Sequence, residues 1–226
     1  VGGKTGINTF HGKNLIGAFH QPAAVFIDPT ILKSLPSKDY LAGYAEVVKY
    51  ALINDKRFFD WLEKNRKKIL KLDYQTIEKI VYTCCSKKAE IVGQDEKESG
   101  KRMYLNLGHT FAHAIESELD YKVMHGEAVS LGLLMAMKLS FYLGKIEMSK
   151  YVLVENHLRR INLPTTLIEI NKKKKWSANK ILNKMKSDKK VADNFIRFIL
   201  CKDIGEVFIK SNISRDKILM TIKDFI

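Results

Sequence analysis

The chain has 226 residues, 46% of them hydrophobic, and a formal net charge of +14 at pH 7. This hydrophobic content is sufficient for a sizeable core, in one large domain or two small ones. No apolar run approaches the roughly 20 residues that span a bilayer and no signal-peptide pattern opens the chain, so we expect a cytoplasmic protein without a membrane partner.

Helical periodicity dominates the chain after a short N-terminal strand segment. Residues 23–28 are expected to form a strand that ends before Pro29, and residues 32–36 a loop or single turn. The predicted helices span residues 38–53, 56–71, 74–94, 105–119, 126–143, 147–160 and 177–187. A predicted hairpin has its strands at 195–200 and 206–210, and a last helix spans 215–225. Residues 126–143 are apolar nearly all round, which is typical of a helix in the middle of a bundle. The sequence therefore predicts a mainly α fold with a small C-terminal β-hairpin.

The excess of lysine raises the question of nucleic-acid binding. Its strongest local support is the run of four lysines at 172–175, which is followed by Trp176. The other lysines are spread along the whole chain and are not interleaved with aromatic residues, as is usual for an ordinary solvated surface. We therefore expect no nucleic-acid partner.

Three histidines lie between positions 109 and 125, and two of them are four residues apart in one predicted helix. At roughly 100° per residue, Asn106, His109 and His113 fall within an arc of about 60° on one helix face. His125 lies at the expected start of the next long helix, where the helix dipole disfavours positive charge and favours the neutral imidazole that binds metals. The first helix is thus expected to bury its apolar side and to direct imidazoles from the other.

Glu46 is the best upstream candidate for an anionic partner of these histidines. It lies in an otherwise apolar helical stretch, and a charged glutamate is rarely buried unless it is paired or binds a metal. Two histidines and one carboxylate make a catalytic zinc-type set with an open coordination position. Histidine pairs with this spacing also occur as exposed or hydrogen-bonded residues without a ligand, so spacing alone leaves both interpretations open.

Several blocks of the chain resemble the 3-dehydroquinate synthase family. In family order, the matching blocks are residues 2–8, 12–22, 43–50, 106–116, 125–129 and 188–190. The resemblance implies the multi-helix C-terminal domain of the dehydroquinate synthase-like fold. It also implies a lyase of the shikimate pathway that uses NAD and a divalent metal. The implied reaction converts 3-deoxy-D-arabino-heptulosonate 7-phosphate to 3-dehydroquinate with elimination of phosphate.

The resemblance also implies roles for individual residues. Glu46, His109 and His125 would bind Zn, with Co as an alternative, and His113 and Lys49 would be catalytic. The implied substrate-binding residues are Asn14, Lys49, Lys88, Arg102, Leu105, Asn106, His113, Lys189 and Lys190. The implied NAD-binding residues are Lys4, Lys13, Asn14, Ser34 and Leu35.

Two of these roles stay open. His113 lies one helical turn beyond His109, a spacing at which both can share one zinc ion. The resemblance points instead to a substrate-side histidine that assists proton transfer or binds the phosphate, and a structural role beside the metal is a third interpretation. The sequence also does not decide which of Lys189 and Lys190 contacts the phosphate.

The family's preceding NAD-binding half, with its glycine-rich turn, has no counterpart in the chain. Residues 1–30 are therefore predicted to border an NAD-binding domain, and residues 31–226 to form the helical metal- and substrate-binding domain. Alone, the chain is expected to bind NAD poorly or not at all and to be inactive. The complete enzyme is expected to be a homodimer that acts on a small sugar phosphate.

Three other functions compete with this interpretation. Another zinc-dependent sugar phosphate cyclase is the nearest, but Arg102 and Lys88 favour a substrate that bears a carboxylate, because buried cations opposite a neutral hydroxyl would be left uncompensated. A polyol dehydrogenase of the same architecture would release reduced nicotinamide. A basic nucleic-acid-binding module would hold no metal and would bind in a salt-sensitive way.

Overall fold

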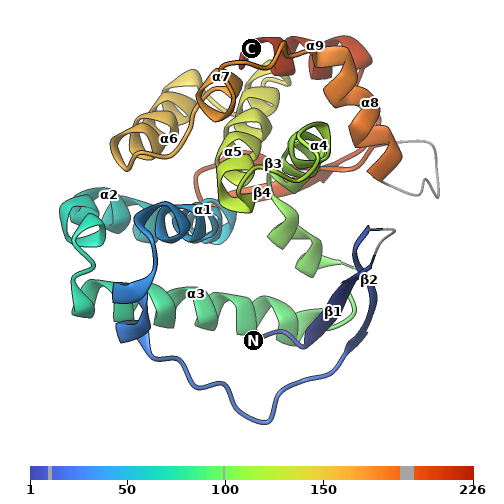
Figure 1. Cartoon of the computed structure of the whole chain (residues 1–226). Coiled ribbons are helices and arrows are strands. Elements are labelled where there is room, and N and C mark those ends of the chain that lie inside the picture. The colour runs from blue at the N-terminus through green and yellow to red at the C-terminus, as the bar shows by residue number, and fades with distance from the viewer. Residues whose placement is uncertain (10–11, 99, 189–195) are drawn as a thin grey trace.

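The computed structural model describes residues 1–9, 12–98, 100–188 and 196–226 (Figure 1). Its N-terminal elements are β1 (Lys4–Thr9), β2 (Gly12–Phe19) and the 3-10 helix η1 (Pro29–Ser34). The helical part comprises α1 (Ser37–Asn54), α2 (Lys56–Leu70), α3 (Tyr74–Gln94), the 3-10 helix η2 (Lys101–Asn106), α4 (His109–Glu118), α5 (His125–Tyr142), α6 (Met148–Arg160), α7 (Leu167–Ile170) and α8 (Ala178–Asp188). The chain continues with β3 (Phe198–Asp203), β4 (Glu206–Lys210) and α9 (Arg215–Lys223). The predicted mainly α fold with a short N-terminal strand segment and a small C-terminal hairpin is confirmed.

The N-terminal strands lie earlier in the chain than predicted. β1 and β2 form an antiparallel hairpin in which Ile7 pairs with Ile16. The expected strand at 23–28 is wrong: this segment has no strand partner among the described residues and runs beneath α3 in Figure 1. Phe26 in its middle is 96% exposed. An apolar run becomes a strand only when a neighbouring strand pairs with its backbone, and local pattern does not supply that neighbour.

Helix α5 forms the centre of the helical core. It is buried along most of its length, including Met135 and Met137, as the apolar pattern predicts. Helices α1, α4, α6 and α9 and strand β3 pack against it, and Figure 1 shows α1 between α3 and α5. Within the part of the chain that the structure describes, no helix is both long and apolar enough to cross a membrane.

Two glycines of α5 allow neighbouring backbones to approach it closely. A Cβ on Gly126 would overlap the carbonyl oxygen of Ala42 in α1, and a Cβ on Gly132 would overlap that of Gly108, just before α4. Gly108 has φ 77°, in the left-handed region, so the predicted helix from 105 is interrupted there and α4 begins at His109. These contacts bring the start of α5 beside α1, which carries Glu46, and the start of α4 beside the middle of α5.

A buried histidine connects α1, α2 and α6. The ring of His157 lies 3.0 Å from the Tyr44 hydroxyl through Nε2 and 2.6 Å from a carboxylate oxygen of Glu63 through Nδ1. Glu63 also pairs with Arg160 at 3.1 Å. Burial lowers the pKa of His157 despite its carboxylate partner. The interior of the bundle therefore holds a neutral imidazole that donates to Glu63 and accepts from Tyr44.

Candidate metal centre and substrate site

Glu46, His109 and His125 meet where α1, α4 and α5 come together. One ligand atom from each lies within 4.8 Å of the others. Nε2 of His125 is 3.2 Å and Nε2 of His109 is 3.4 Å from the same oxygen, Oε1 of Glu46. The three residues predicted as ligands from separate segments of the sequence are therefore adjacent in the fold.

The distances within this triad suit a divalent ion. Tetrahedral zinc with bonds of about 2.0–2.1 Å separates its ligand atoms by roughly 3.3–3.4 Å. The two distances from histidine nitrogen to glutamate oxygen, 3.2 and 3.4 Å, are close to this separation. One carboxylate and two imidazoles are also the donor types that zinc and cobalt accept. The residues present thus fit the metal that the sequence analysis expects.

Glu46 offers its two oxygens to different partners. Oε1 faces the two histidines, whereas Oε2 pairs with Nζ of Lys49 at 2.5 Å. Burial favours the protonated acid, but the charge of Lys49 and hydrogen bonds from His109 and His125 outweigh it and hold the pKa of Glu46 well below its usual range. Glu46 is therefore an ionised carboxylate, which is the form that binds a metal.

The outer nitrogen of each histidine in the triad has its own acceptor. Nδ1 of His109 lies 3.1 Å from the carbonyl oxygen of Leu107, and Nδ1 of His125 lies 3.2 Å from Oε1 of Glu116. Hydrogen bonds to Glu116 and Glu46 raise the pKa of His125 to about 9 in the metal-free site. Metal binding at Nε2 must therefore displace a proton there.

His113 lies beside the triad but outside it. Its ring centroid is 5.5 Å from that of His109 and 6.4 Å from that of His125. Among the described residues, the group whose ligand atoms lie close enough to share an ion contains Glu46, His109 and His125. This arrangement favours the substrate-side interpretation of His113 over the fourth-ligand interpretation.

Lys88, in α3, and Arg102, in η2, both lie close to Gly2. A Cβ on Gly2 would be 3.1 Å from Cε of Lys88 and 3.3 Å from Nη2 of Arg102. Burial, together with the charges of Lys49 and Arg102, lowers the pKa of Lys88. Three cations thus act on one another in one region, an arrangement that a bound anion would stabilise.

Arg102 is buried and its guanidinium is already hydrogen-bonded in the structure. It donates through Nη2 to the carbonyl oxygen of Gly2 at 2.5 Å and through Nη1 to that of Glu96. These bonds tie the first residues of the chain to the loop between α3 and η2. Recognition of a substrate carboxylate by Arg102 stays a prediction.

Glu98 connects two residues with different predicted roles. Its Oε1 accepts from Nδ2 of Asn106, predicted to bind substrate, at 2.7 Å. Its Oε2 pairs with Nζ of Lys4, predicted to lie on the NAD side. Glu98 has φ 62°, which is uncommon for a residue other than glycine. The hairpin and the end of η2 therefore contact the same carboxylate.

The structure places the other predicted residues on separate segments. Leu105 is half-buried at the end of η2 and packs against the core, and Ser34 and Leu35 are exposed at the end of η1. Lys13 and Asn14 belong to β2, where the structure describes the backbone alone. Lys189 and Lys190 lie outside the described residues. The roles of all seven residues stay predictions.

Two acidic residues that contact candidate residues, Glu116 and Glu98, are missing from the sequence-based candidates. Glu116 is seven residues after His109 and three after His113, so it shares their helix face, and it is 2% exposed. The reasoning that selected Glu46, a carboxylate in an apolar helix, applies equally to Glu116. Glu98 offers no such signal, because it lies in a loop without periodicity.

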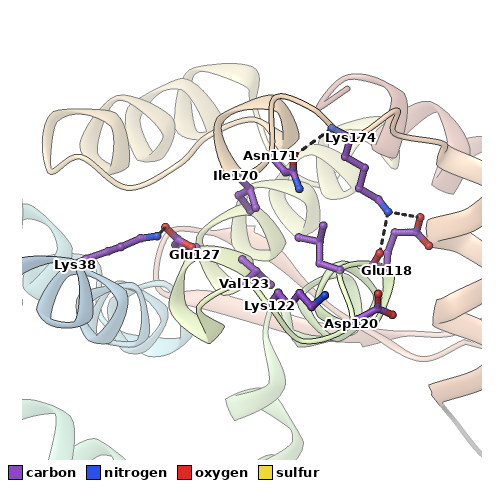
Figure 2. A pocket seen from close by; sticks show the side chains of 10 residues that line it. Lys38, Glu118, Asp120, Lys122, Val123, Glu127, Ile170, Asn171 and Lys174 are labelled. Carbon is purple, nitrogen blue, oxygen red and sulfur yellow. Dashed lines mark hydrogen bonds and ion pairs between the residues drawn. The ribbon is translucent and has the colours of Figure 1, made fainter.

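A separate pocket lies at the other end of α4. Figure 2 shows its lining, which comes from the α4–α5 connection, the start of α1 and the segment after α7, around a cavity of about 330 Å³. Lys174 pairs with Glu118 at 3.0 Å, and Lys38 pairs with Glu127 at 3.2 Å. Because these charges balance each other, the pocket lacks the excess of one sign that marks the region around Lys88.

Comparisons with known families match almost the whole chain. The family model described as 3-dehydroquinate synthase C-terminal matches residues 43–191, and the model described as 3-dehydroquinate synthase N-terminal matches residues 1–42. A 3-dehydroquinate synthase of Rhodospirillum rubrum is 44% identical over 225 residues, which cover 99% of this chain and 58% of that protein. One of Bartonella tribocorum is 45% identical over 222 residues, covering 97% of this chain and 58% of that protein. The chain thus spans rather more than half the length of these relatives.

Solved structures with the same fold have lower sequence identity to this chain. The 2-epi-5-epi-valiolone synthase of Streptomyces hygroscopicus, solved with NAD+ and Zn2+ bound, superposes with a TM-score of 0.87 at 22% identity, covering 100% of this chain and 61% of that one. A 2-deoxy-scyllo-inosose synthase complexed with carbaglucose-6-phosphate, NAD+ and Co2+ gives 0.86 at 24% identity, covering 99% and 62%. The chain shares the fold of these synthases, and the family models match residues 1–191: the chain belongs to the 3-dehydroquinate synthase family.

Proposed function

We propose that the chain is the metal- and substrate-binding part of a 3-dehydroquinate synthase. The complete enzyme would convert 3-deoxy-D-arabino-heptulosonate 7-phosphate to 3-dehydroquinate and phosphate, with NAD and a divalent ion as cofactors. The observation that carries the proposal is the convergence of the Glu46, His109 and His125 triad with Lys49, whose charge also acts on Lys88. A metal-binding set beside a group of cations suits a substrate with hydroxyls, a phosphate and a carboxylate.

Each part of this site has a distinct task in the proposed reaction. Glu46, His109 and His125 hold the divalent ion. When bound, that ion supplies Lewis acidity toward hydroxyl and carbonyl oxygens, and NAD supplies reversible hydride acceptance. The ammonium of Lys49 is fixed by Glu46 and so presents a positive charge at a defined position beside the ion site.

The cations and His113 act on the rest of the substrate. Lys49, Lys88 and Arg102 bind its anionic groups, and Asn106 orients it by hydrogen bonding. His113 moves a proton or hydrogen-bonds the phosphate from the face next to the triad. Much of the catalysis then rests on position and fixed charge, which lower a barrier without many separate acids and bases.

Turnover by a fusion tests this proposal. The fusion joins this chain behind the segment of the Rhodospirillum rubrum relative that it does not match, and is assayed with NAD and zinc beside the chain alone. We expect equal amounts of 3-dehydroquinate and phosphate from the fusion, no turnover by the chain alone, and none by a fusion with Glu46→Gln. Metal content of each purified protein verifies that the substitution acts through the ion.

Two further measurements separate the competing functions. Net accumulation of reduced nicotinamide would contradict the synthase and support a polyol dehydrogenase. Turnover of a heptulose phosphate that lacks the carboxylate, in preference to the heptulosonate, would support a different cyclase. Arg102→Ala should weaken turnover of the heptulosonate strongly, and unchanged kinetics would contradict its role.

The expected homodimer and the expected cytoplasmic location are part of this proposal. Sedimentation of the fusion tests the first, and fractionation of the producing cells tests the second. Salt-sensitive binding of nucleic acid by a metal-free chain would instead support the basic binding module.

A further inference from the structure

The two histidines of the triad are restrained at their outer nitrogen by groups that only accept hydrogen bonds. Nδ1 of His109 faces the Leu107 carbonyl oxygen at 3.1 Å, and Nδ1 of His125 faces Oε1 of Glu116 at 3.2 Å. An acceptor at Nδ1 requires the ring hydrogen to be on that nitrogen. Nε2 of each ring is then the nitrogen left to bind an ion, and in both rings it faces Oε1 of Glu46.

The restraint on His125 differs from the restraint on His109. The acceptor of His109 is a backbone carbonyl only two residues away, whereas the acceptor of His125 is a side chain on another helix, nine residues earlier. The His125 side chain is 45% exposed, against 13% for that of His109. Packing therefore restricts the His125 ring less, and its orientation depends more strongly on hydrogen bonds.

Glu116 is well placed to supply that restraint. Its side chain is 3% exposed, so its carboxylate is held by the packing of α4 and does not sample many positions. A buried carboxylate is costly unless it is paired, which favours keeping the contact with His125. Resting on the proposed metal site, we infer that Glu116 is a positioning residue that fixes the hydrogen of His125 on Nδ1 and directs Nε2 at the ion.

Zinc affinity of substituted chains tests this inference without reference to turnover. Competition with a chelating dye would compare the unsubstituted chain with Glu116→Gln and Glu116→Ala. Loss of an outer hydrogen-bond partner typically weakens metal binding by about 10- to 100-fold, and we expect Glu116→Ala to fall in this range. Glu116→Gln should lose less, because its amide oxygen still accepts from Nδ1. Glu118→Gln is the matched control on the same helix, since Glu118 pairs with Lys174 and not with a histidine.

A second readout reports on the ring itself. Nitrogen NMR of the zinc-loaded, unsubstituted chain should show His125 protonated at Nδ1 and bound to metal at Nε2, and this pattern should be lost or mixed in Glu116→Ala. Circular dichroism identifies which variants fold. The inference about Glu116 would be overturned if the Glu116 variants that fold bind zinc within about twofold of the unsubstituted chain and show an unchanged nitrogen pattern. The proposed metal site would then still stand. Failure of the unsubstituted chain to bind zinc would overturn the metal site as well.

Discussion

Oε2 of Glu46 lies 2.5 Å from Nζ of Lys49, one helical turn further along α1. The other oxygen of the same carboxylate faces His109 and His125. One carboxylate thus links a cation that is 5% exposed to the proposed ion site. Because Lys49 and the ion are both positive, we expect them to compete for the negative charge of Glu46. We also expect them to bind different parts of the substrate.

Replacing Lys49 should therefore separate metal binding from turnover. In Lys49→Gln, we expect zinc affinity to stay the same or to increase, because a neighbouring positive charge is removed. Turnover by the fusion should fall by about tenfold or more, because a charge-assisted contact with substrate is lost. Dye competition and phosphate release measure the two effects.

The half-buried Lys87, which pairs with Asp55 at 2.7 Å, provides a control for the loss of a paired lysine. Lys87→Gln should leave both zinc affinity and turnover nearly unchanged. A loss of zinc affinity in Lys49→Gln would contradict the prediction, because it would mean that Lys49 acts mainly by holding Glu46 in place.

His113 should prove dispensable for metal binding and necessary for turnover. Its ring lies 5.5 Å from that of His109 but outside the group that can share one ion. We expect His113→Asn to bind one cobalt ion per chain with the visible spectrum of the unsubstituted protein. Turnover should fall by about 100-fold, as is usual when a proton-transfer group is removed. His109→Asn, by contrast, should lose the cobalt spectrum, and a changed spectrum in His113→Asn would restore the fourth-ligand interpretation.

The close contact between α1 and α5 should not tolerate a methyl group. A Cβ on Gly126 would overlap the carbonyl oxygen of Ala42, so Gly126→Ala must separate the two helices. We expect the free energy of unfolding to fall by about 1–3 kcal/mol or more, and zinc affinity to fall with it, because His125 is the preceding residue.

Gly43, in α1, provides the matched control. A Cβ there meets nothing within 4 Å. Because alanine is favoured over glycine inside a helix, Gly43→Ala should raise the free energy of unfolding by about 0.5–1 kcal/mol. Denaturant unfolding of both variants measures the difference, and equal stability of the two variants would show that α1 and α5 are not held as closely as described.

The buried His157 should make the fold sensitive to acid. Because burial lowers its pKa in the folded chain, the unfolded chain binds protons more readily as the pH falls below the unfolded value of about 6.5. The stability that neutral His157 contributes is therefore complete above about pH 6.5 and is lost as the pH falls toward the folded pKa. Denaturant unfolding with saturating zinc measures the free energy of unfolding of the unsubstituted chain and of His157→Asn. The difference between the two should shrink from neutral to acid pH. A difference that does not change with pH would contradict this account.

Local sequence pattern was sufficient for most of the long helices, but it left the metal-binding interpretation of the histidines open. Periodicity located the buried helix α5, and the spacing of His109 and His113 placed both on one face of α4, since these relations involve residues only a few positions apart. The assignment of Glu46 and His125 to the same ion also needed the family resemblance.

Contacts between distant residues required the tertiary structure. Whether residues 23–28 form a strand depends on a pairing partner, and the hairpin of β1 and β2 arises from pairing between facing residues such as Ile7 and Ile16. The pairing of Glu116 with His125 follows from how α4 and α5 pack, and that packing depends on contacts such as the one between Gly132 and Gly108. Periodicity shows which face of a helix a side chain occupies, but only the packed chain determines which partner that face meets.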